Sequence, residues 1–189
     1  MGYTPIDFIR SASFFLLNKL NQLPIFFRKI RFYYFTKCWP RHLGKGVKQL
    51  RVANNMKLGA DSSFYSNVIL EIGENAPLTI GKNFTISYGS IIVCNAGVQI
   101  GDYVMIGEYT SIRDTTHSSD KAELAFCRQP DISFPIILGN NVWIGRGCIL
   151  LPGAVIGDNV IVGANSLVKG VLESNSIYAG SPATKIKSL

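Results

Sequence analysis

Aliphatic residues recur at every sixth position along most of this 189-residue chain, starting near residue 50. The longest unbroken series has six members, from Leu138 to Val168. A short β-strand cannot bury its apolar side alone, but three strands joined by tight turns form a triangular coil of about 18 residues, and stacked coils share one core. The period therefore predicts an all-β parallel β-helix rather than scattered strands or a helical bundle. The series comprises Val52, Leu58, Phe64, Leu70, Ile72, Leu78, Ile80, Ile86, Ile92, Val98, Ile100, Ile106, Ile112, Leu138, Ile144, Leu150, Ile156, Val162 and Val168.

The series is irregular at a few places, where two aliphatic residues are only two positions apart. Leu78 and Ile80 form one such pair, and Val98 and Ile100 form another. We expect these steps to be two-residue insertions at the corners of the coil, since a solenoid tolerates insertions on its outside.

Composition agrees with a solenoid and limits the chemistry. Charged residues make up 16% of the chain, and 18 residues are glycine, which suits frequent sharp turns. The four cysteines (Cys38, Cys94, Cys127 and Cys148) are far apart and show no metal-ligand spacing. We expect reduced thiols in a cytoplasmic protein. The chain has two histidines in total, so we expect no His-rich metal site.

Positive charge is concentrated at the N-terminus. Residues 1–51 contain ten Lys and Arg and one Asp, a net charge of +9, whereas residues 52–189 contain nine basic and eleven acidic residues, a net charge of −2. Eleven of the 21 aromatic residues lie in residues 1–40. A cationic, aromatic segment indicates first a membrane surface and second nucleic acid. Nucleic acid is disfavoured because the basic residues are interleaved with apolar ones.

The N-terminal segment, residues 1–45, is predicted to be helical. Residues 4–23 show helical spacing of apolar side chains, with Thr4 as a candidate cap, and residues 25–37 are expected to form a second short amphipathic helix. Two roles stay open for this segment: it caps the open end of the solenoid, or residues 4–37 bind the inner face of the membrane peripherally. No signal peptide is evident, and the apolar runs are too short to span a bilayer.

The second predicted unit, residues 46–189, contains one long interruption, the loop 113–137 between Ile112 and Leu138. A long excursion from a tight solenoid is usually functional. The loop contains His117, and histidine is the side chain best suited to accept a proton near neutral pH. His117 is therefore the candidate general base.

Three segments together resemble the hexapeptide-repeat acyltransferases: IGDYVMIGEYTSIRDTTH (100–117), VWIGRGCILLPGAVIGDNVIVGANSLVKG (142–170) and YAGSPATKIK (178–187). The sequence is similar to the maltose and galactoside O-acetyltransferases and to the O-acetyltransferases of bacterial surface polysaccharides. This resemblance implies a left-handed coil and a homotrimer with acyl-CoA clefts between subunits. It also implies acetyl-CoA as the acyl donor.

The resemblance also implies roles for individual residues. His117 would deprotonate an acceptor hydroxyl, whose oxygen attacks the acetyl-CoA thioester while a backbone N–H binds the oxyanion. Asp114 is a candidate for orienting His117. Ser87 stands where maltose-type enzymes carry an Asn near the acceptor, and Ser87, Asn95 and Asp114 are the acceptor-side candidates. The candidates for binding CoA are Trp143, Gly145, Arg146, Gly163, Ala164, Lys169, Lys185 and Lys187.

The expected function is therefore acetyl-CoA-dependent O-acetylation of a sugar hydroxyl in a bacterial surface polysaccharide or its precursor. Two alternatives stay open. One is an N-acetyltransferase of an amino sugar nucleotide, or an enzyme that acetylates an antibiotic. The other is a non-catalytic β-helix scaffold.

Overall fold

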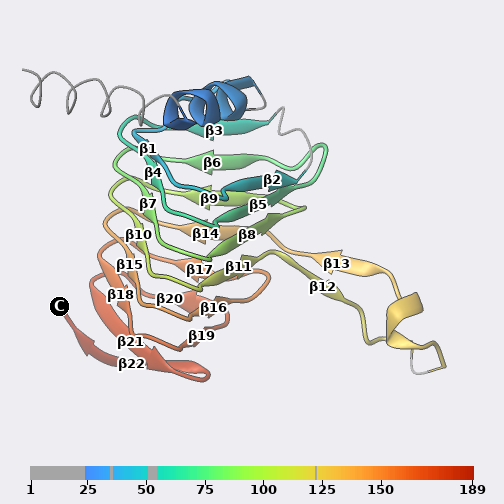
Figure 1. The fold of residues 1–189 in the computed structure, drawn as a ribbon. Helices are drawn as coiled ribbons and strands as arrows, with labels where there is room; N and C mark the ends of the chain where they lie inside the picture. Colours follow the sequence, from blue (N-terminus) through green and yellow to red (C-terminus); the bar gives the residue numbers. More distant parts are fainter. Residues whose placement is uncertain (1–23, 35, 51–54, 122) are drawn as a thin grey trace, which may run out of the picture.

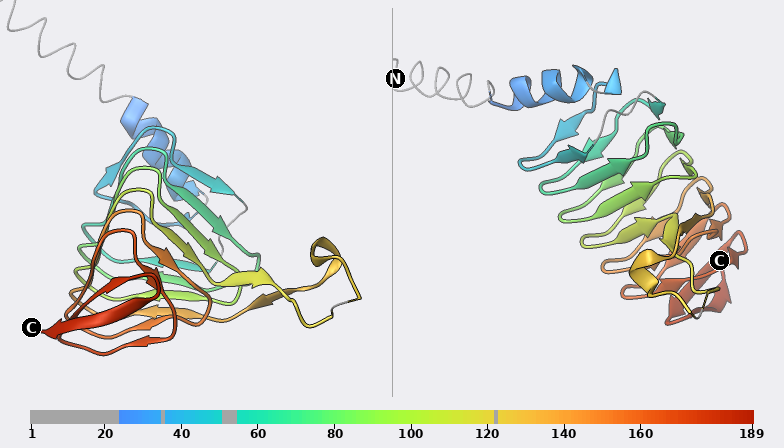
Figure 2. Two further views of the ribbon diagram at one scale, coloured as in Figure 1. Left: turned by 90° about the horizontal axis from the view of Figure 1, so that it is seen from below. Right: turned by 90° about the vertical axis from the view of Figure 1, so that its right-hand side faces the viewer.

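The protein is described by a computed structural model that covers residues 24–34, 36–50, 55–121 and 123–189. Three parallel β-sheets form the sides of a triangular prism, seen along its axis in Figure 2 (left). The chain contributes one strand to each sheet in turn, which produces six coils followed by a C-terminal hairpin. The predicted parallel β-helix is thus confirmed.

Each sheet collects one strand from every coil, and all neighbouring strands are parallel except the final pair, β21 and β22. Sheet A contains β1 (His42–Leu43), β4 (Ser63–Phe64), β7 (Thr85–Ile86), β10 (Met105–Ile106), β15 (Trp143–Ile144), β18 (Val160–Val162), β21 (Ser176–Gly180) and β22 (Ala183–Ser188). Sheet B contains β2 (Lys48–Leu50), β5 (Ile69–Ile72), β8 (Ile91–Cys94), β11 (Ser111–Arg113), β16 (Ile149–Leu150) and β19 (Leu167–Val168). Sheet C contains β3 (Met56–Leu58), β6 (Leu78–Ile80), β9 (Val98–Ile100), β14 (Ile136–Leu138), β17 (Val155–Ile156) and β20 (Val171–Leu172).

Three corners connect the sheets, and each is named here by the two sheets that it joins. Corner AB comprises residues 44–47, 65–68, 87–90, 107–110, 145–148 and 163–166. Corner BC comprises residues 73–77, 95–97, 114–135, 151–154 and 169–170. Corner CA comprises residues 59–62, 81–84, 101–104, 139–142, 157–159 and 173–175.

The predicted aliphatic series lines the interior of the prism. In sheet A, Ile86 is in register with Ile106, which is in register with Ile144, so each side chain lies above its equivalent in the next coil. Members of the series from Phe64 to Val168 are at most 2% exposed, whereas Leu58 is partly buried. Val52 lies outside the described residues. Full burial of such a side chain contributes roughly 1.5–3 kcal/mol each relative to exposure.

The two-residue steps lie within strands, so the expectation of insertions at corners is wrong. Leu78 and Ile80 both belong to β6, and Val98 and Ile100 both belong to β9. All four side chains are buried, because alternate residues of a strand point to the same side of the sheet. The steps therefore mark longer strands, which present two side chains to the core instead of one.

A helix lies across the open end of the first coil (Figures 1 and 2). Residues 24–34 are helical, in agreement with the helix predicted over 25–37, while the helix predicted over 4–23 lies outside the described residues. Phe32 is 5% exposed, and its ring centroid is 5.5 Å from that of Phe64 in the core. The helix therefore covers apolar core side chains that would otherwise be exposed at this end of the solenoid.

The solenoid begins slightly before residue 46, since β1 (His42–Leu43) already pairs with β4 in sheet A. Among the described residues, no helix is both long enough and apolar enough to cross a membrane.

Replacement of Ile144 by Ala tests the role of the stacked core. We expect Ile144→Ala to lower the free energy of unfolding by about 2–5 kcal/mol, because it removes a fully buried side chain and leaves a cavity. Chemical denaturation followed by circular dichroism measures the change. Ile149→Ala is the matched control, since the Ile149 side chain is 47% exposed, and it should cost far less. Equal losses for the two variants would contradict the assignment of the core.

Candidate active site

The interruption in the aliphatic series forms an arm that projects from corner BC (Figures 1 and 2). Strands β12 (Thr115–His117) and β13 (Asp131–Ser133) pair in antiparallel orientation, and a short 3-10 helix, η1 (Phe126–Arg128), lies near the tip. The solenoid continues past the arm without loss of register, because β14 pairs with β9 on one side and with β17 on the other.

Asp114 fixes the base of the arm. Its side chain is fully buried, and its carboxylate accepts hydrogen bonds of 2.7–2.9 Å from the backbone N–H groups of Asn95, Ala96 and Gly97 in the preceding coil. Charge-assisted bonds of this kind offset the cost of burying a carboxylate. Because these contacts occupy the carboxylate, they argue against the expectation that Asp114 orients His117.

The carboxylate that contacts His117 belongs instead to Asp131. His117 and Asp131 are directly opposite each other in the arm, and His117 Nδ1 lies 2.7 Å from Asp131 Oδ1. A carboxylate at Nδ1 fixes that nitrogen as the donor and leaves Nε2 as the proton acceptor. Both side chains are about two-thirds exposed, at 66% and 62%, so Nε2 is accessible to a substrate.

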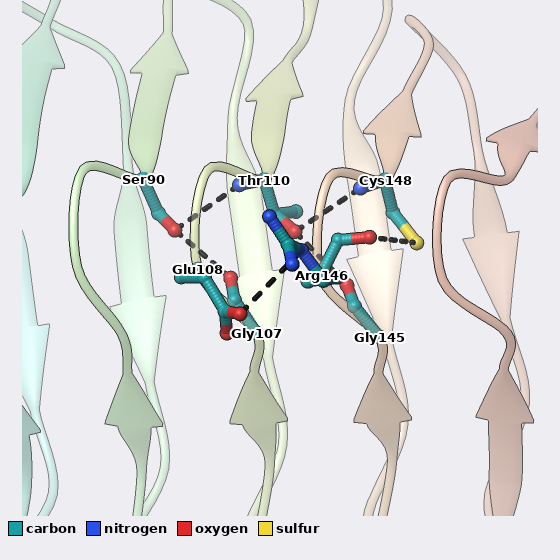
Figure 3. A network of polar contacts seen from close by, with 7 residues as sticks. All are labelled: Ser90, Gly107, Glu108, Thr110, Gly145, Arg146 and Cys148. Carbon is teal, nitrogen blue, oxygen red and sulfur yellow. Dashed lines mark hydrogen bonds and ion pairs between the residues drawn. The ribbon is translucent and has the colours of Figure 1, made fainter.

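Four of the predicted CoA-binding residues lie at corner AB, and Trp143 lies just before them in β15. The backbone N–H of Gly145 donates to the carbonyl of Val162, and a Cβ added at Gly145 would lie 2.6 Å from the backbone nitrogen of Ala164. Glycine is therefore needed for this close approach of two coils. Arg146 Nε lies 3.5 Å from Glu108 Oε1, which connects two coils on the outside of the corner (Figure 3).

On the inner side of this corner, hydroxyl groups donate hydrogen bonds to backbone carbonyls of the next coil (Figure 3). Ser90 Oγ donates to the carbonyl of Gly107 at 2.9 Å, and Thr110 Oγ1 donates to that of Gly145 at 3.1 Å. Cys148 Sγ continues the pattern with a contact of 3.1 Å to the carbonyl of Gly163. These inward-facing side chains at corner AB therefore connect each coil to the next by hydrogen bonds.

The buried cysteines are poor nucleophiles. Burial raises the pKa of the Cys148 thiol, and burial together with the nearby Asp114 charge raises the pKa of Cys94 to about 12. Since the thiolate is the reactive form, neither side chain is activated for covalent catalysis at neutral pH. Both act as small core residues.

The other predicted residues are distributed over the corners and the C-terminal end. Ser87 lies at corner AB, while Asn95 and Lys169 lie at corner BC. Lys185 and Lys187 are on β22, and Lys185 Nζ is 3.0 Å from Glu173 Oε2. Within the described ranges, no cluster of three or more His, Cys, Asp or Glu side chains could hold a metal ion.

His117 and the CoA-binding candidates of corner AB lie at different corners of the prism. Sheet B separates corner BC, which carries the arm, from corner AB, which carries Gly145 and Arg146. A single chain therefore does not bring His117 and these residues together. This separation is not evident from the sequence, because His117 and Trp143 are only 26 positions apart. Between them the chain passes through β14 of sheet C and then through corner CA.

Comparison with known proteins places this fold and sequence in a family. The sequence profile described as "Bacterial transferase hexapeptide (six repeats)" matches residues 135–170. The galactoside O-acetyltransferase of Escherichia coli K12 is 37% identical over 122 residues, which are 65% of this chain and 58% of that protein. The putative lipopolysaccharide biosynthesis O-acetyl transferase WbbJ of the same organism is 32% identical over 145 residues, which are 61% of this chain and 74% of WbbJ. This chain belongs to the hexapeptide-repeat acetyltransferases.

A solved structure agrees with this membership. The hexapeptide-repeat acetyltransferase VCA0836 of Vibrio cholerae, in complex with acetyl coenzyme A, is 25% identical with a TM-score of 0.54. The match covers 83% of this chain and 73% of that one. The left-handed hand of the coil, which the period alone does not specify, follows from membership of the hexapeptide-repeat family. The chain spans just over half the length of the galactoside O-acetyltransferase.

Removal of the buried carboxylate tests whether Asp114 anchors the arm. Asp114→Asn should lower the free energy of unfolding by roughly 2–3 kcal/mol, because the amide group cannot accept all the backbone N–H bonds that the carboxylate accepts. Thermal or chemical unfolding measures the loss. Asp131→Asn serves as the control and should leave stability nearly unchanged, since an exposed pair contributes little. An unaltered stability of Asp114→Asn would show that these bonds do not hold the arm.

Proposed function

We propose that this chain is an acetyl-CoA-dependent O-acetyltransferase that acts on a sugar hydroxyl of a bacterial surface polysaccharide or its precursor. The pairing of His117 with Asp131 on the projecting arm carries this proposal, because it provides an oriented, accessible base. Support also comes from the names of the relatives, which are O-acetyltransferases of a galactoside and of lipopolysaccharide biosynthesis.

The proposed reaction transfers the acetyl group directly. His117 Nε2 takes the proton of the acceptor hydroxyl as its oxygen attacks the thioester carbonyl carbon. The new C–O bond forms, the C–S bond breaks, and the imidazolium returns the proton to the departing CoA sulfur. Asp131 stabilises the imidazolium that forms during transfer, and a backbone N–H binds the oxyanion.

The separation of the two corners supports a homotrimer with active sites between subunits. In such an assembly the arm of one subunit would reach corner AB of its neighbour and bring His117 to the candidates there. Exposed apolar side chains on both partners are consistent with this contact: Phe126 and Phe134 on the arm are 70% and 54% exposed, and Trp143 is 51% exposed.

Acetyl-CoA would then lie along corner AB. Gly145, Gly163 and Ala164 would leave room for the pantetheine arm, because they carry little or no side chain. Arg146 would supply positive charge for the CoA phosphates at this corner, and the exposed Lys169 of corner BC and Lys185 and Lys187 of β22 are the further candidates for that role. On the acceptor side, Ser87 and Asn95 offer polar groups at the two corners that the trimer would bring together.

The outer surface of the N-terminal helix supports peripheral contact with an anionic membrane on its cytoplasmic side. Residues 24–48 contain seven Lys and Arg and no acidic residue. Phe26, Phe27 and Trp39 are at least half exposed and pack edge to face, while Lys29 Nζ lies 5.8 Å from the centre of the Trp39 ring. Phe32 is the helix residue that packs against the core, where it contacts Phe64. Capping of the core therefore does not account for the exposed Phe26, Phe27 and Trp39.

Loss of the base should abolish most of the transfer. We expect His117→Ala to lower kcat by roughly 10²–10⁴-fold and Asp131→Asn to lower it by about tenfold or more, with the KM for acetyl-CoA nearly unchanged. Release of the CoA thiol in the presence of lipopolysaccharide or capsule oligosaccharides is the assay. Full acceptor-dependent release by His117→Ala would overturn the mechanism. Acetylation of amino sugars but not of hydroxyl acceptors would replace it with N-acetylation.

Liposome flotation tests membrane contact. The full chain should float with anionic vesicles, less so at high salt, and should not float with neutral phosphatidylcholine vesicles. Joint replacement of Phe26, Phe27 and Trp39 by Ser should weaken flotation severalfold. Tyr103→Ser, which removes an aromatic residue of similar exposure at corner CA, should not. Equal flotation of the triple variant and the unaltered chain would contradict the proposed membrane contact.

A further inference from the structure

A row of aromatic side chains runs along the outside of corner AB from the second coil to the fourth, and continues to His42 in β1 of the first coil. We name the set His42, Tyr65, Tyr88 and Tyr109 the aromatic row. The ring centroids of His42 and Tyr65 are 5.2 Å apart, and those of Tyr65 and Tyr88 are 5.1 Å apart. The Tyr109 ring lies over Gly89, where an added Cβ would come within 2.7 Å of it. Tyr88 is 49% exposed and Tyr109 is 65% exposed.

The solenoid does not require aromatic residues here. In the fifth and sixth coils the same corner carries Gly145, Arg146, Gly163 and Ala164, and the coils stack in the same register. Aromatic residues at this corner are thus confined to the second, third and fourth of the six coils. A role in coil stacking alone would not explain this restriction.

Tyr109 adds a second, independent observation. Its φ is +58°, in the left-handed region that a bulky side chain adopts at an energetic cost. Other coils place glycine or asparagine at this point of corner AB, namely Gly46, Asn67, Gly89, Gly147 and Asn165. Tyr103 has the same φ at corner CA, so the informative observation is the presence of tyrosine at a position where the other coils of corner AB carry glycine or asparagine.

We propose that the aromatic row is a binding subsite for the sugar rings of an extended glycan. The C–H faces of pyranose rings pack on exposed aromatic rings, and phenol and imidazole groups hydrogen-bond to the sugar hydroxyls. Ser87 precedes Tyr88 at the same corner segment, and Glu108 precedes Tyr109 at the next. Glu108 contacts Arg146, one of the CoA-binding candidates (Figure 3). The row therefore holds acceptor units that lie outside the reaction centre. The identity of this glycan as the acceptor rests on the proposed function, whereas its binding does not.

Binding in the absence of acetyl-CoA tests the subsite without transfer. The probe is an array of oligosaccharides from bacterial O-antigens and capsules, with affinities of the bound members then measured by calorimetry. Tyr65→Ala and Tyr88→Ala should each weaken binding roughly three- to tenfold. Tyr103→Ala is the matched control, because Tyr103 is 53% exposed with φ +58° but lies at corner CA, and its affinity should equal that of the unaltered chain. Failure of the unaltered chain to bind any oligosaccharide overturns the proposal, as does unchanged affinity in both variants.

Tyr109→Asn separates binding from stability. Asparagine occupies this turn position at residues 67 and 165, so the variant should keep or raise the melting temperature while it weakens oligosaccharide binding severalfold. A purely structural tyrosine predicts the reverse, a lower melting temperature with unchanged affinity. If Tyr109→Asn changes the oligomeric state and leaves the affinity for oligosaccharides unchanged, a second copy of the chain covers the aromatic row and the subsite proposal is wrong. Oligosaccharide binding without acetyl transfer would leave the subsite in place and overturn the proposed function instead.

Discussion

The stacking of one coil on the next is the interaction on which the rest of this molecule depends. A two- or three-residue strand has too little apolar surface to be stable alone, so each strand relies on parallel neighbours above and below. Backbone hydrogen bonds connect the coils, and the aliphatic side chains inside them lie in register. The helix that places Phe32 against Phe64 closes one end of this stack, and the antiparallel strand β22 covers sheet A at the other.

Because the interior is uniform, the features that distinguish one coil from another lie at the corners. Corner BC carries the arm with His117, and corner AB carries four of the CoA-binding candidates and the three tyrosines of the aromatic row. The turns themselves are restricted, since many of them need left-handed backbone conformations that Gly, Asn and Asp tolerate. Tyr103 at corner CA and Tyr109 at corner AB depart from these residue types, and only Tyr109 lies beside other aromatic side chains of its corner.

Most of the solenoid could be predicted from the sequence, because a side-chain period of six translates directly into burial, and from Phe64 onward every member of the series is in the core. The position of His117 on an excursion was predicted for the same reason, as a break in the period. Asp131 could not be found this way, because its pairing with His117 depends on the antiparallel register of the arm, which leaves no local trace in the sequence. Asp114, the candidate named from the sequence, does not take this role, because its carboxylate accepts hydrogen bonds from backbone N–H groups of the preceding coil.

The arm leaves and rejoins the prism at one corner, and β14 keeps its register with β9 and β17 regardless of what lies between. The length and composition of the arm are thus uncoupled from the stability of the stack. Natural selection can lengthen, shorten or recompose such an excursion at little thermodynamic cost, as long as its anchoring carboxylate and its cross-strand pair are retained. The same rigid prism can therefore carry arms of different length and sequence. Acceptor specificity can change in this way without a change of fold.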